Sequence, residues 1–153
     1  MSQETSPLWV LRGGRVIDPF TGTDAVLDLL VTSDRVRALA PDERAPDGAR
    51  ELRADGLLVC PAFVEVHAHL REPGGEEAET IASGLDAARA GGYGHVLAMA
   101  NTRPTNDDPA VTRRMLAAAD AAATGVALHP VSAVTIGLEG REAAPWRAQL
   151  DAG

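Results

Sequence analysis

Three short apolar runs at almost equal spacing constrain the fold of this chain more than any other feature. They start at residues 63, 95 and 126, which are 32 and 31 residues apart. Short apolar runs of this kind suit the buried strands of a parallel sheet. A (β/α)8 barrel uses about 31 residues for each strand and helix, and a doubly wound sheet has a similar period. The spacing therefore predicts an α/β fold and leaves both architectures open.

Two helices are predicted between these runs. The first carries apolar residues at helical spacing and ends at a glycine pair: Ala78, Ile81, Ala82, Leu85 and Ala88, then Gly91-Gly92. The second should begin with Asp108 as N-cap and Pro109 in the first turn, and should end at Gly125. A third helix is expected to start near Glu142.

The residues before the first of these runs follow a different pattern, in which brief β-type runs alternate with turn formers. The expected strands are Leu8–Leu11, Arg15–Ile17, Val26–Val31, Arg35–Ala40, Glu51–Arg53 and Leu57–Cys60. The pair Gly13-Gly14 is interpreted as a turn between the first two. We predict a small β-domain at residues 1–60, followed by a partial barrel at residues 61–153. Cys60, the only cysteine, lies in an apolar run and is expected to be buried.

The number of strands limits the barrel prediction. Only three strand–helix units fit before Gly153, whereas a (β/α)8 barrel closes with eight. Three parallel strands would leave two unpaired edges and an uncovered apolar face. We therefore expect the barrel to be incomplete in this chain, which would be a portion of a longer protein or would be completed by another chain.

The first of the three runs ends in a histidine pair that suggests a metal site. His67 and His69 occupy alternate strand positions, so both side chains should lie on one face, about 6.6 Å apart along the strand at roughly 3.3 Å per residue. A catalytic zinc normally needs three protein ligands. Two further candidates lie in the chain: His95 is interpreted as an ordinary, partly exposed histidine, and His129, which could also reach a barrel interior, as a packed one. The remaining metal ligands must then come from outside these histidines. The alternative is that His67 and His69 bind no metal and stand together by chance.

Two more polar residues follow the predicted strands. Arg71 comes just after the first strand and Asn101 just after the second, and the carboxyl ends of parallel strands form the binding edge in both barrels and open sheets. A guanidinium offers a planar fork of donors to a carboxylate, and holding an anion fixes the orientation of a substrate. Taken singly, Arg71 would be a surface arginine and Asn101 a turn residue. Together with the histidines they predict hydrolysis of an acidic small molecule.

The charge balance argues against several other functions. Fourteen Lys and Arg face 22 Asp and Glu, which gives a net charge of -8. A duplex phosphate backbone would be repelled by this charge. The first residues lack a signal-peptide pattern, and no apolar run approaches the ~20 residues of a membrane span. We predict a cytoplasmic protein that binds neither nucleic acid nor membranes.

Several stretches together resemble the first part of bacterial dihydroorotases of the amidohydrolase superfamily. They are PAFVEVHAHLREPG, GGEEAETIASGLDAARAGGYGHV, MANTRP and HPVSAVTIGLEG, and the likeness extends from near Gly13 to the last residue. The HxHLREPG run with a downstream Asn-Thr-x-Pro separates dihydroorotases from allantoinases and hydantoinases. The resemblance implies a metal-dependent (β/α)8 barrel flanked by a small β-domain.

The resemblance also implies roles for individual residues. His67 and His69 would be ligands of one or two Zn2+ ions, and Arg71 and Asn101 would hold the substrate carboxylate. The implied reaction is the reversible cyclisation of N-carbamoyl-L-aspartate to dihydroorotate in de novo pyrimidine biosynthesis. The family's general acid/base and remaining metal ligands have no counterpart here and are expected beyond Gly153, so the isolated segment should be inactive. The family further implies association with itself or with aspartate carbamoyltransferase.

Some positions depart from the family pattern. Glu65 replaces the usual Asp before the histidine pair, and by strand alternation it should face the same side as His67. Met99-Ala100 replaces the commoner Met-Pro. Two alternatives to the leading hypothesis are a non-catalytic, dihydroorotase-like structural partner of another enzyme and a cyclic amidase of hydantoinase or allantoinase type. Arg71 and Asn101 disfavour the second, because those neutral rings carry no carboxylate.

Overall fold

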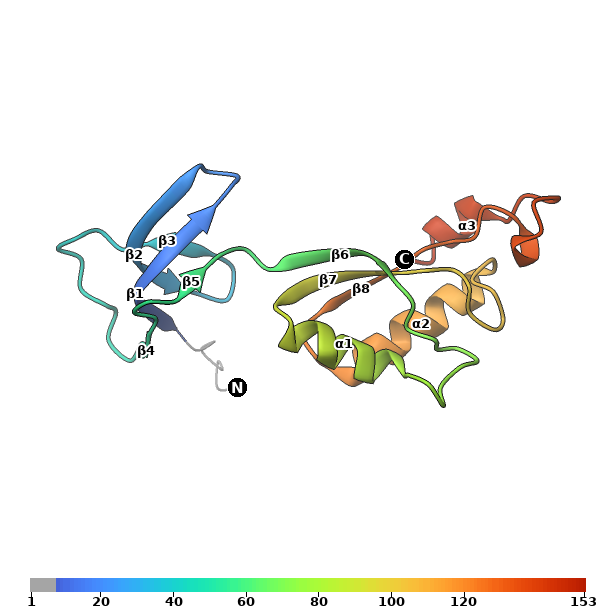
Figure 1. The fold of residues 1–153 in the computed structure, drawn as a ribbon, viewed down its shortest axis with the longest axis horizontal. Helices are drawn as coiled ribbons and strands as arrows, with labels where there is room; N and C mark the ends of the chain where they lie inside the picture. The colour runs from blue at the N-terminus through green and yellow to red at the C-terminus, as the bar shows by residue number, and fades with distance from the viewer. Residues whose placement is uncertain (1–7) are drawn as a thin grey trace, which may run out of the picture. The chain divides into compact units, whose positions relative to one another are not determined.

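A computed structural model describes residues 8–153, and in it the chain divides into two units between Pro61 and Ala62. The first unit is built on a five-stranded sheet (Figure 1). Its strands are β1 (Trp9–Asp18), β2 (Thr23–Val31), β3 (Val36–Ala38), β4 (Arg50–Arg53) and β5 (Leu58–Val59). Their order is β3-β2-β1-β4, and β5 also pairs with β1. Strand β1 is antiparallel to β2 and parallel to β4 and β5.

The glycine pair predicted as a turn lies instead inside a continuous strand. Strand β1 runs through Gly13 and Gly14, and the pairing with β2 shifts its register between Leu11 and Gly14. Gly13 has a positive φ of 73°, and its N–H donates to Asp28 Oδ1 at 2.9 Å. The prediction of a turn was wrong because a glycine with positive φ can also form a β-bulge, which bends a strand without ending it.

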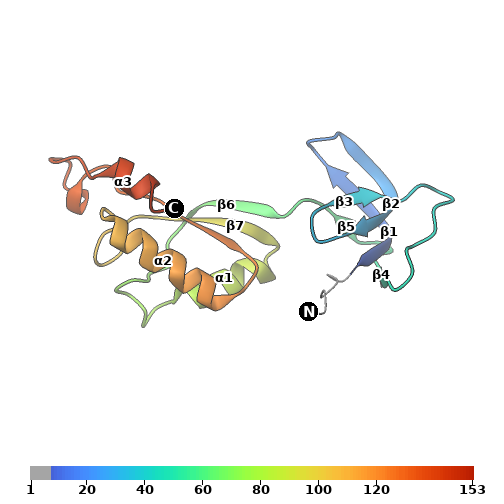
Figure 2. The same cartoon turned by 180° about the vertical axis from the view of Figure 1, so that it is seen from behind.

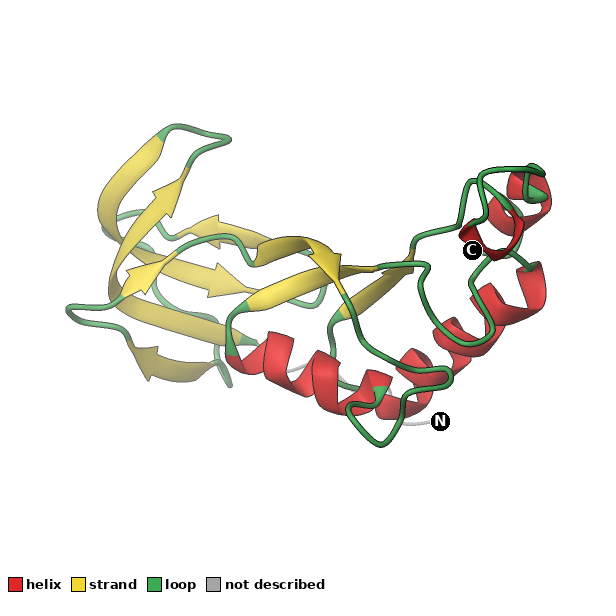
Figure 3. Cartoon of the chain, turned by 45° about the vertical axis from the view of Figure 1, so that its right-hand side comes forward, coloured by secondary structure: helices red, strands yellow, loops and turns green. Residues whose placement is uncertain are grey.

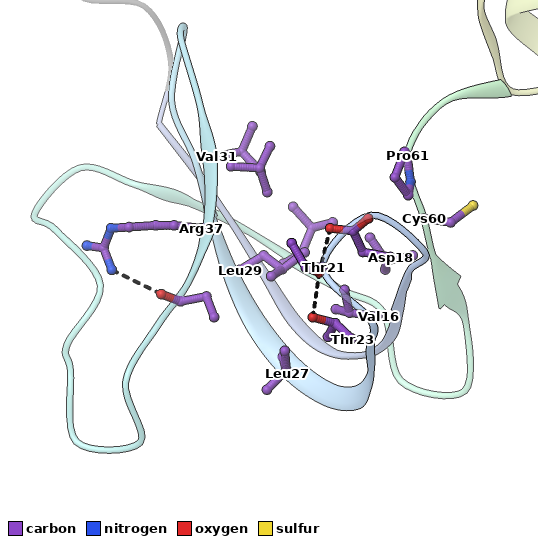
Figure 4. A pocket seen from close by; sticks show the side chains of 14 residues that line it. Val16, Asp18, Thr21, Thr23, Leu27, Leu29, Val31, Arg37, Cys60 and Pro61 are labelled. Atoms are coloured by element: carbon purple, nitrogen blue, oxygen red, sulfur yellow. Dashed lines mark hydrogen bonds between the residues drawn. The ribbon is translucent and has the colours of Figure 1, made fainter. Parts of the chain in front are cut away.

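Cys60 is exposed, so the prediction of a buried thiol was wrong. It lines an open cavity of about 600 Å3 together with apolar side chains of β1 and β2, among them Val16 and Leu29 (Figure 4). Leu57 and Leu58 of the same run are also largely exposed, at 59% and 64%. The apolar run therefore does not indicate burial here, because apolar atoms also make up much of an ordinary protein surface.

The second unit contains a parallel sheet of three strands in the order β6-β7-β8. Its elements are β6 (Phe63–Ala68), α1 (Ile81–Ala90), β7 (Tyr93–Ala98), α2 (Pro109–Ala122), β8 (Ala127–Pro130), the short 3-10 helix η1 (Ile136–Leu138) and α3 (Trp146–Leu150). The predicted alternation of strands and helices is confirmed, with β7 starting two residues earlier than expected. The third helix starts at Trp146 rather than near Glu142.

Helices α1 and α2 lie along one face of this sheet, as Figure 1, the reverse view in Figure 2 and the helices drawn red in Figure 3 all show. The core between the two layers is formed by Leu70, Ile81, Leu85, Val96, Ala98, Val111, Met115, Val126 and Leu128. Thr80 caps α1 in a reciprocal pair with Ser83, and Asp108 accepts a bond from the Ala110 N–H at 2.7 Å. The predicted N-cap and first-turn proline of α2 are confirmed.

A buried asparagine joins the loop after β7 to the segment after β8. Asn106 is fully buried; its Nδ2 donates to the Val131 carbonyl at 3.0 Å and its Oδ1 accepts from Thr112 Oγ1 at 2.8 Å. The Asn106 carbonyl accepts from the Ala133 N–H at 2.8 Å and from Gln149 Nε2 at 3.1 Å. This network holds the loop after β7 in place.

Among residues 8–153, the structure contains no helix with the length and apolar character needed to cross a membrane.

Candidate functional site

The predicted site residues come from two neighbouring strand ends. The first loop (residues 69–80) joins β6 to α1, and the second loop (residues 99–108) joins β7 to α2. The Arg103 N–H of the second loop donates to the Pro73 carbonyl of the first, and the Met99 N–H donates to the carbonyl of Ala68, the last residue of β6, both at 2.8 Å. The loops are therefore positioned by backbone contacts at the carboxyl edge of the sheet, where parallel α/β folds bind ligands.

The two histidines lie close together and are both exposed. His67 is in β6 and His69 follows it directly; their ring centroids are 5.2 Å apart, with the planes inclined at 67°. A register shift interrupts the pairing of β6 with β7 between Glu65 and Ala68. Glu65 Oε1 accepts a hydrogen bond from the His67 main-chain N–H at 3.0 Å.

His69 contacts the second loop directly. Its Nδ1 lies 2.7 Å from Oδ1 of Asn101, a hydrogen bond between residues that are 32 positions apart in the sequence. The contact joins a predicted metal ligand to a predicted substrate-binding residue. No pattern in the sequence indicates it.

Arg71 and Asn101 line the same cavity, which has a volume of about 410 Å3 and is also lined by Thr102 and Arg103. Arg71 has a positive φ of 64°, a conformation that is uncommon for residues other than glycine. Within residues 8–153 its guanidinium takes part in no ion pair. The cavity therefore offers unpaired guanidinium donors and lies beside the histidine pair.

Three residues that the sequence reasoning missed hold the first loop in place. Leu70 is buried in the core, and Glu72 Oε2 accepts from the Ile81 N–H at 2.7 Å, at the start of α1. Gly74 donates its N–H to Glu76 Oε2 at 2.9 Å, and this bond contributes most to lowering the pKa of Glu76 below its usual value. The available signal was the Leu-Arg-Glu-Pro-Gly stretch directly after the histidines, in which Leu70, Glu72 and Gly74 serve the loop rather than the chemistry.

Gly74 of the first loop lies against Arg103 of the second, and we expect Gly74→Ala to disrupt this contact. A Cβ at this position would overlap with the Arg103 carbonyl oxygen, and the φ of +93° disfavours any side chain. The clash with main chain and the strained φ should together lower the free energy of unfolding by roughly 2–4 kcal/mol. Urea denaturation followed by circular dichroism measures this change.

The matched control is Gly125→Ala. Gly125 also has a positive φ, +80°, but a Cβ there would meet nothing within 4 Å. This variant should therefore lose only the roughly 1–2 kcal/mol of backbone strain. Equal losses of unfolding free energy in Gly74→Ala and Gly125→Ala would show that the clash with Arg103 does not affect stability.

The other two histidines form a pair of their own. His95 Nδ1 lies 3.0 Å from His129 Nε2, and the rings are nearly parallel at 23°. Both side chains are exposed, so the interpretation of His129 as a packed residue was wrong: it lies on the face of the sheet away from the helical core. In the part of the chain that the structure describes, no three His, Cys, Asp or Glu side chains are grouped so as to hold a metal ion.

The chain is similar in sequence to known proteins. Residues 56–153 match the family model described as dihydro-orotase-like. The dihydroorotase of Geobacter metallireducens is 45% identical over 131 residues, which are 86% of this chain and 31% of that protein. The dihydroorotase of Solibacter usitatus is 43% identical over 144 residues, covering 94% of this chain and 33% of that protein. The chain thus spans about a third of the length of these relatives.

Solved structures show the same fold. A D-hydantoinase matches with a TM-score of 0.58 at 21% identity, over 86% of this chain and 29% of that one. The L-hydantoinase of Arthrobacter aurescens matches with a TM-score of 0.57 at 21% identity, over 72% of this chain and 24% of that one. At this level of identity the likeness concerns the fold alone.

Proposed function

Because this chain belongs to the dihydroorotase-like family, we propose that it provides the small β-domain segment and the first three strand–helix units of a metal-dependent (β/α)8 barrel. The parallel order β6-β7-β8, with both connecting helices on one face, supports this proposal. So does the position of the candidate site at the carboxyl ends of β6 and β7, which is the catalytic face of such barrels.

The activity that we propose for the whole protein is that of a dihydroorotase, the reversible cyclisation of N-carbamoyl-L-aspartate to dihydroorotate. The observation that carries it is that Arg71 and Asn101 line one cavity while Asn101 also contacts His69. A carboxylate held by these two side chains would therefore lie next to the histidine pair. Hydantoin and allantoin carry no carboxylate, so a site for those rings has no use for this arrangement.

His67 and His69 fit part of a zinc site. Imidazole nitrogen is a ligand that suits zinc, and the two exposed rings lie side by side at 5.2 Å between centroids. Since a catalytic zinc takes three protein ligands, we assign the others to later strands of the barrel. The metal would supply Lewis acidity and an activated water molecule.

The residues of this chain would bind and orient the substrate. The Arg71 guanidinium and the Asn101 amide would hold the carboxylate common to dihydroorotate and N-carbamoyl-L-aspartate, and this would keep the amide bond of the ring at a fixed position. Orientation of this kind removes part of the entropic barrier of the reaction. We place the general acid/base outside this chain. Cytoplasmic pyrimidine biosynthesis and association with itself or with aspartate carbamoyltransferase are expectations from the family alone.

A chimeric protein tests the proposed activity. Residues 1–153 would be continued by the remaining two thirds of the Geobacter metallireducens dihydroorotase, with that unmodified enzyme as the control. We expect zinc-dependent hydrolysis of dihydroorotate by the chimera and none by the 153-residue chain. A folded chimera that hydrolysed hydantoin but not dihydroorotate would contradict the substrate assignment.

Arg71→Met tests the anion clamp in the same chimera. Loss of a hydrogen-bonded charge pair with the substrate is worth about 1.5–3 kcal/mol, so KM should rise roughly 10- to 150-fold. Zinc content should be unchanged. Arg89→Met is the control, because Arg89 lies on the exposed side of α1. Loss of zinc in Arg71→Met would show instead that the arginine has a structural role.

A further inference from the structure

We propose that Asn101 is a positioning residue for His69, and that its side-chain carbonyl fixes the tautomer in which His69 can bind a metal ion through Nε2. The inference rests on the proposed metal site and assigns to Asn101 a second role besides carboxylate binding. It starts from the 2.7 Å contact between His69 Nδ1 and Asn101 Oδ1.

The chemistry of the two atoms decides which one donates. A side-chain amide oxygen has lone pairs and no hydrogen, so it only accepts. His69 Nδ1 must therefore carry the hydrogen in this bond, and a neutral imidazole carries only one. His69 Nε2 is then left with its lone pair, which is what a metal ligand requires.

The same bond also fixes the orientation of the Asn101 amide. With Oδ1 engaged by His69, both donors of the amide group remain, and within residues 8–153 neither has a hydrogen-bond partner. A carboxylate accepts hydrogen bonds and offers none when ionised. The Asn101 side chain thus offers its carbonyl oxygen to His69 and its amide N–H groups to the substrate carboxylate.

Both partners of the bond are held by their neighbours in the sequence. His69 lies between Ala68, whose carbonyl accepts from the Met99 N–H, and the buried Leu70. Asn101 lies between the buried residues Ala100 and Thr102, which are 5% and 8% exposed. The two backbones are therefore held by contacts other than this bond, so the bond mainly orders the two side chains.

His67 provides an internal comparison. Its ring makes no hydrogen bond within the described residues, and Glu65 contacts only its main-chain N–H. Asn101 should accordingly determine the tautomer of His69 and leave that of His67 unchanged. A general effect on folding or on the strand would change both rings.

Nitrogen NMR of the imidazole rings tests the inference in the 153-residue chain itself. We expect the Nδ1–H form at His69 in the unmodified chain. In Asn101→Ala, His69 should shift toward the Nε2–H form and bind Zn2+ roughly tenfold more weakly, because partners of this kind typically contribute 10- to 100-fold to metal affinity. In Asn101→Asp, the carboxylate still accepts from Nδ1, so the tautomer and the Zn2+ affinity should be retained.

Two results would overturn the proposal. One is an Nε2–H form at His69 in the unmodified chain, which would mean that the amide of Asn101 donates to Nδ1. The other is an unchanged tautomer and unchanged Zn2+ affinity in Asn101→Ala. Neither measurement depends on turnover, so an inactive chimera would count against the proposed dihydroorotase activity and not against the role of Asn101.

Discussion

Replacing either His67 or His69 by alanine is expected to remove zinc from the chimeric protein and to lower its kcat/KM for dihydroorotate by about a thousandfold or more. Lewis-acid stabilisation by a bound metal is worth several kcal/mol, and each 1.36 kcal/mol corresponds to a factor of ten in rate. Neither ring is buried in the core, so the fold should persist while the site is lost. Zinc content and steady-state kinetics on the same samples measure both effects.

The controls are His95→Ala and His129→Ala, which remove the other histidine pair. These rings bond to each other at 3.0 Å, and we place neither in the metal site. Both variants should keep zinc in the same amount as the parent protein. Full zinc content in His67→Ala and His69→Ala would contradict the assignment of the strand-end pair as metal ligands.

Asn106→Ala is expected to lower the free energy of unfolding by roughly 3–5 kcal/mol. The substitution leaves two partners without a bond, the buried Thr112 hydroxyl and the part-buried Val131 carbonyl. Each buried polar group left unsatisfied costs about 1–3 kcal/mol, and the vacated volume adds to the loss. Because domains are typically stable by about 5–15 kcal/mol, urea denaturation of the chain should show a large shift.

The same substitution at Asn101, the only other asparagine, is the matched control. Asn101 is exposed, so Asn101→Ala should change the unfolding free energy by no more than about 0.5 kcal/mol. Thr112→Val removes one hydrogen bond of the network, so its loss of unfolding free energy should lie between those of Asn101→Ala and Asn106→Ala. Equal stabilities of the two asparagine variants would show that the buried network contributes nothing.

The alternation of strands and helices in the second unit was predictable from the sequence because its signals are local. Apolar runs that start at 63, 95 and 126, the cap at Asp108 and the proline at 109 each indicate an element within a few residues of where it lies. The general rule that polar residues at the carboxyl ends of parallel strands lie together then brings Arg71 and Asn101 to one cavity.

The features that escaped prediction depend on contacts between distant residues. Asn106 and Val131 are 25 positions apart, and His69 and Asn101 are 32 apart. Neither pair belongs to a periodic pattern. In the first unit, the sequence Gly13-Gly14 is compatible with a turn and with a β-bulge. Only the pairing of β1 with β2 shows which of the two is present.

The main-chain bonds between the two loops determine which residues evolution can exchange there without altering the site. Positions 99 and 103 contribute N–H groups, so any residue but proline preserves those bonds. Position 100 contributes only its carbonyl, which accepts from the Asn106 N–H at 3.0 Å, and proline has that group too. Alanine and proline at position 100 are therefore equivalent in this hydrogen bond.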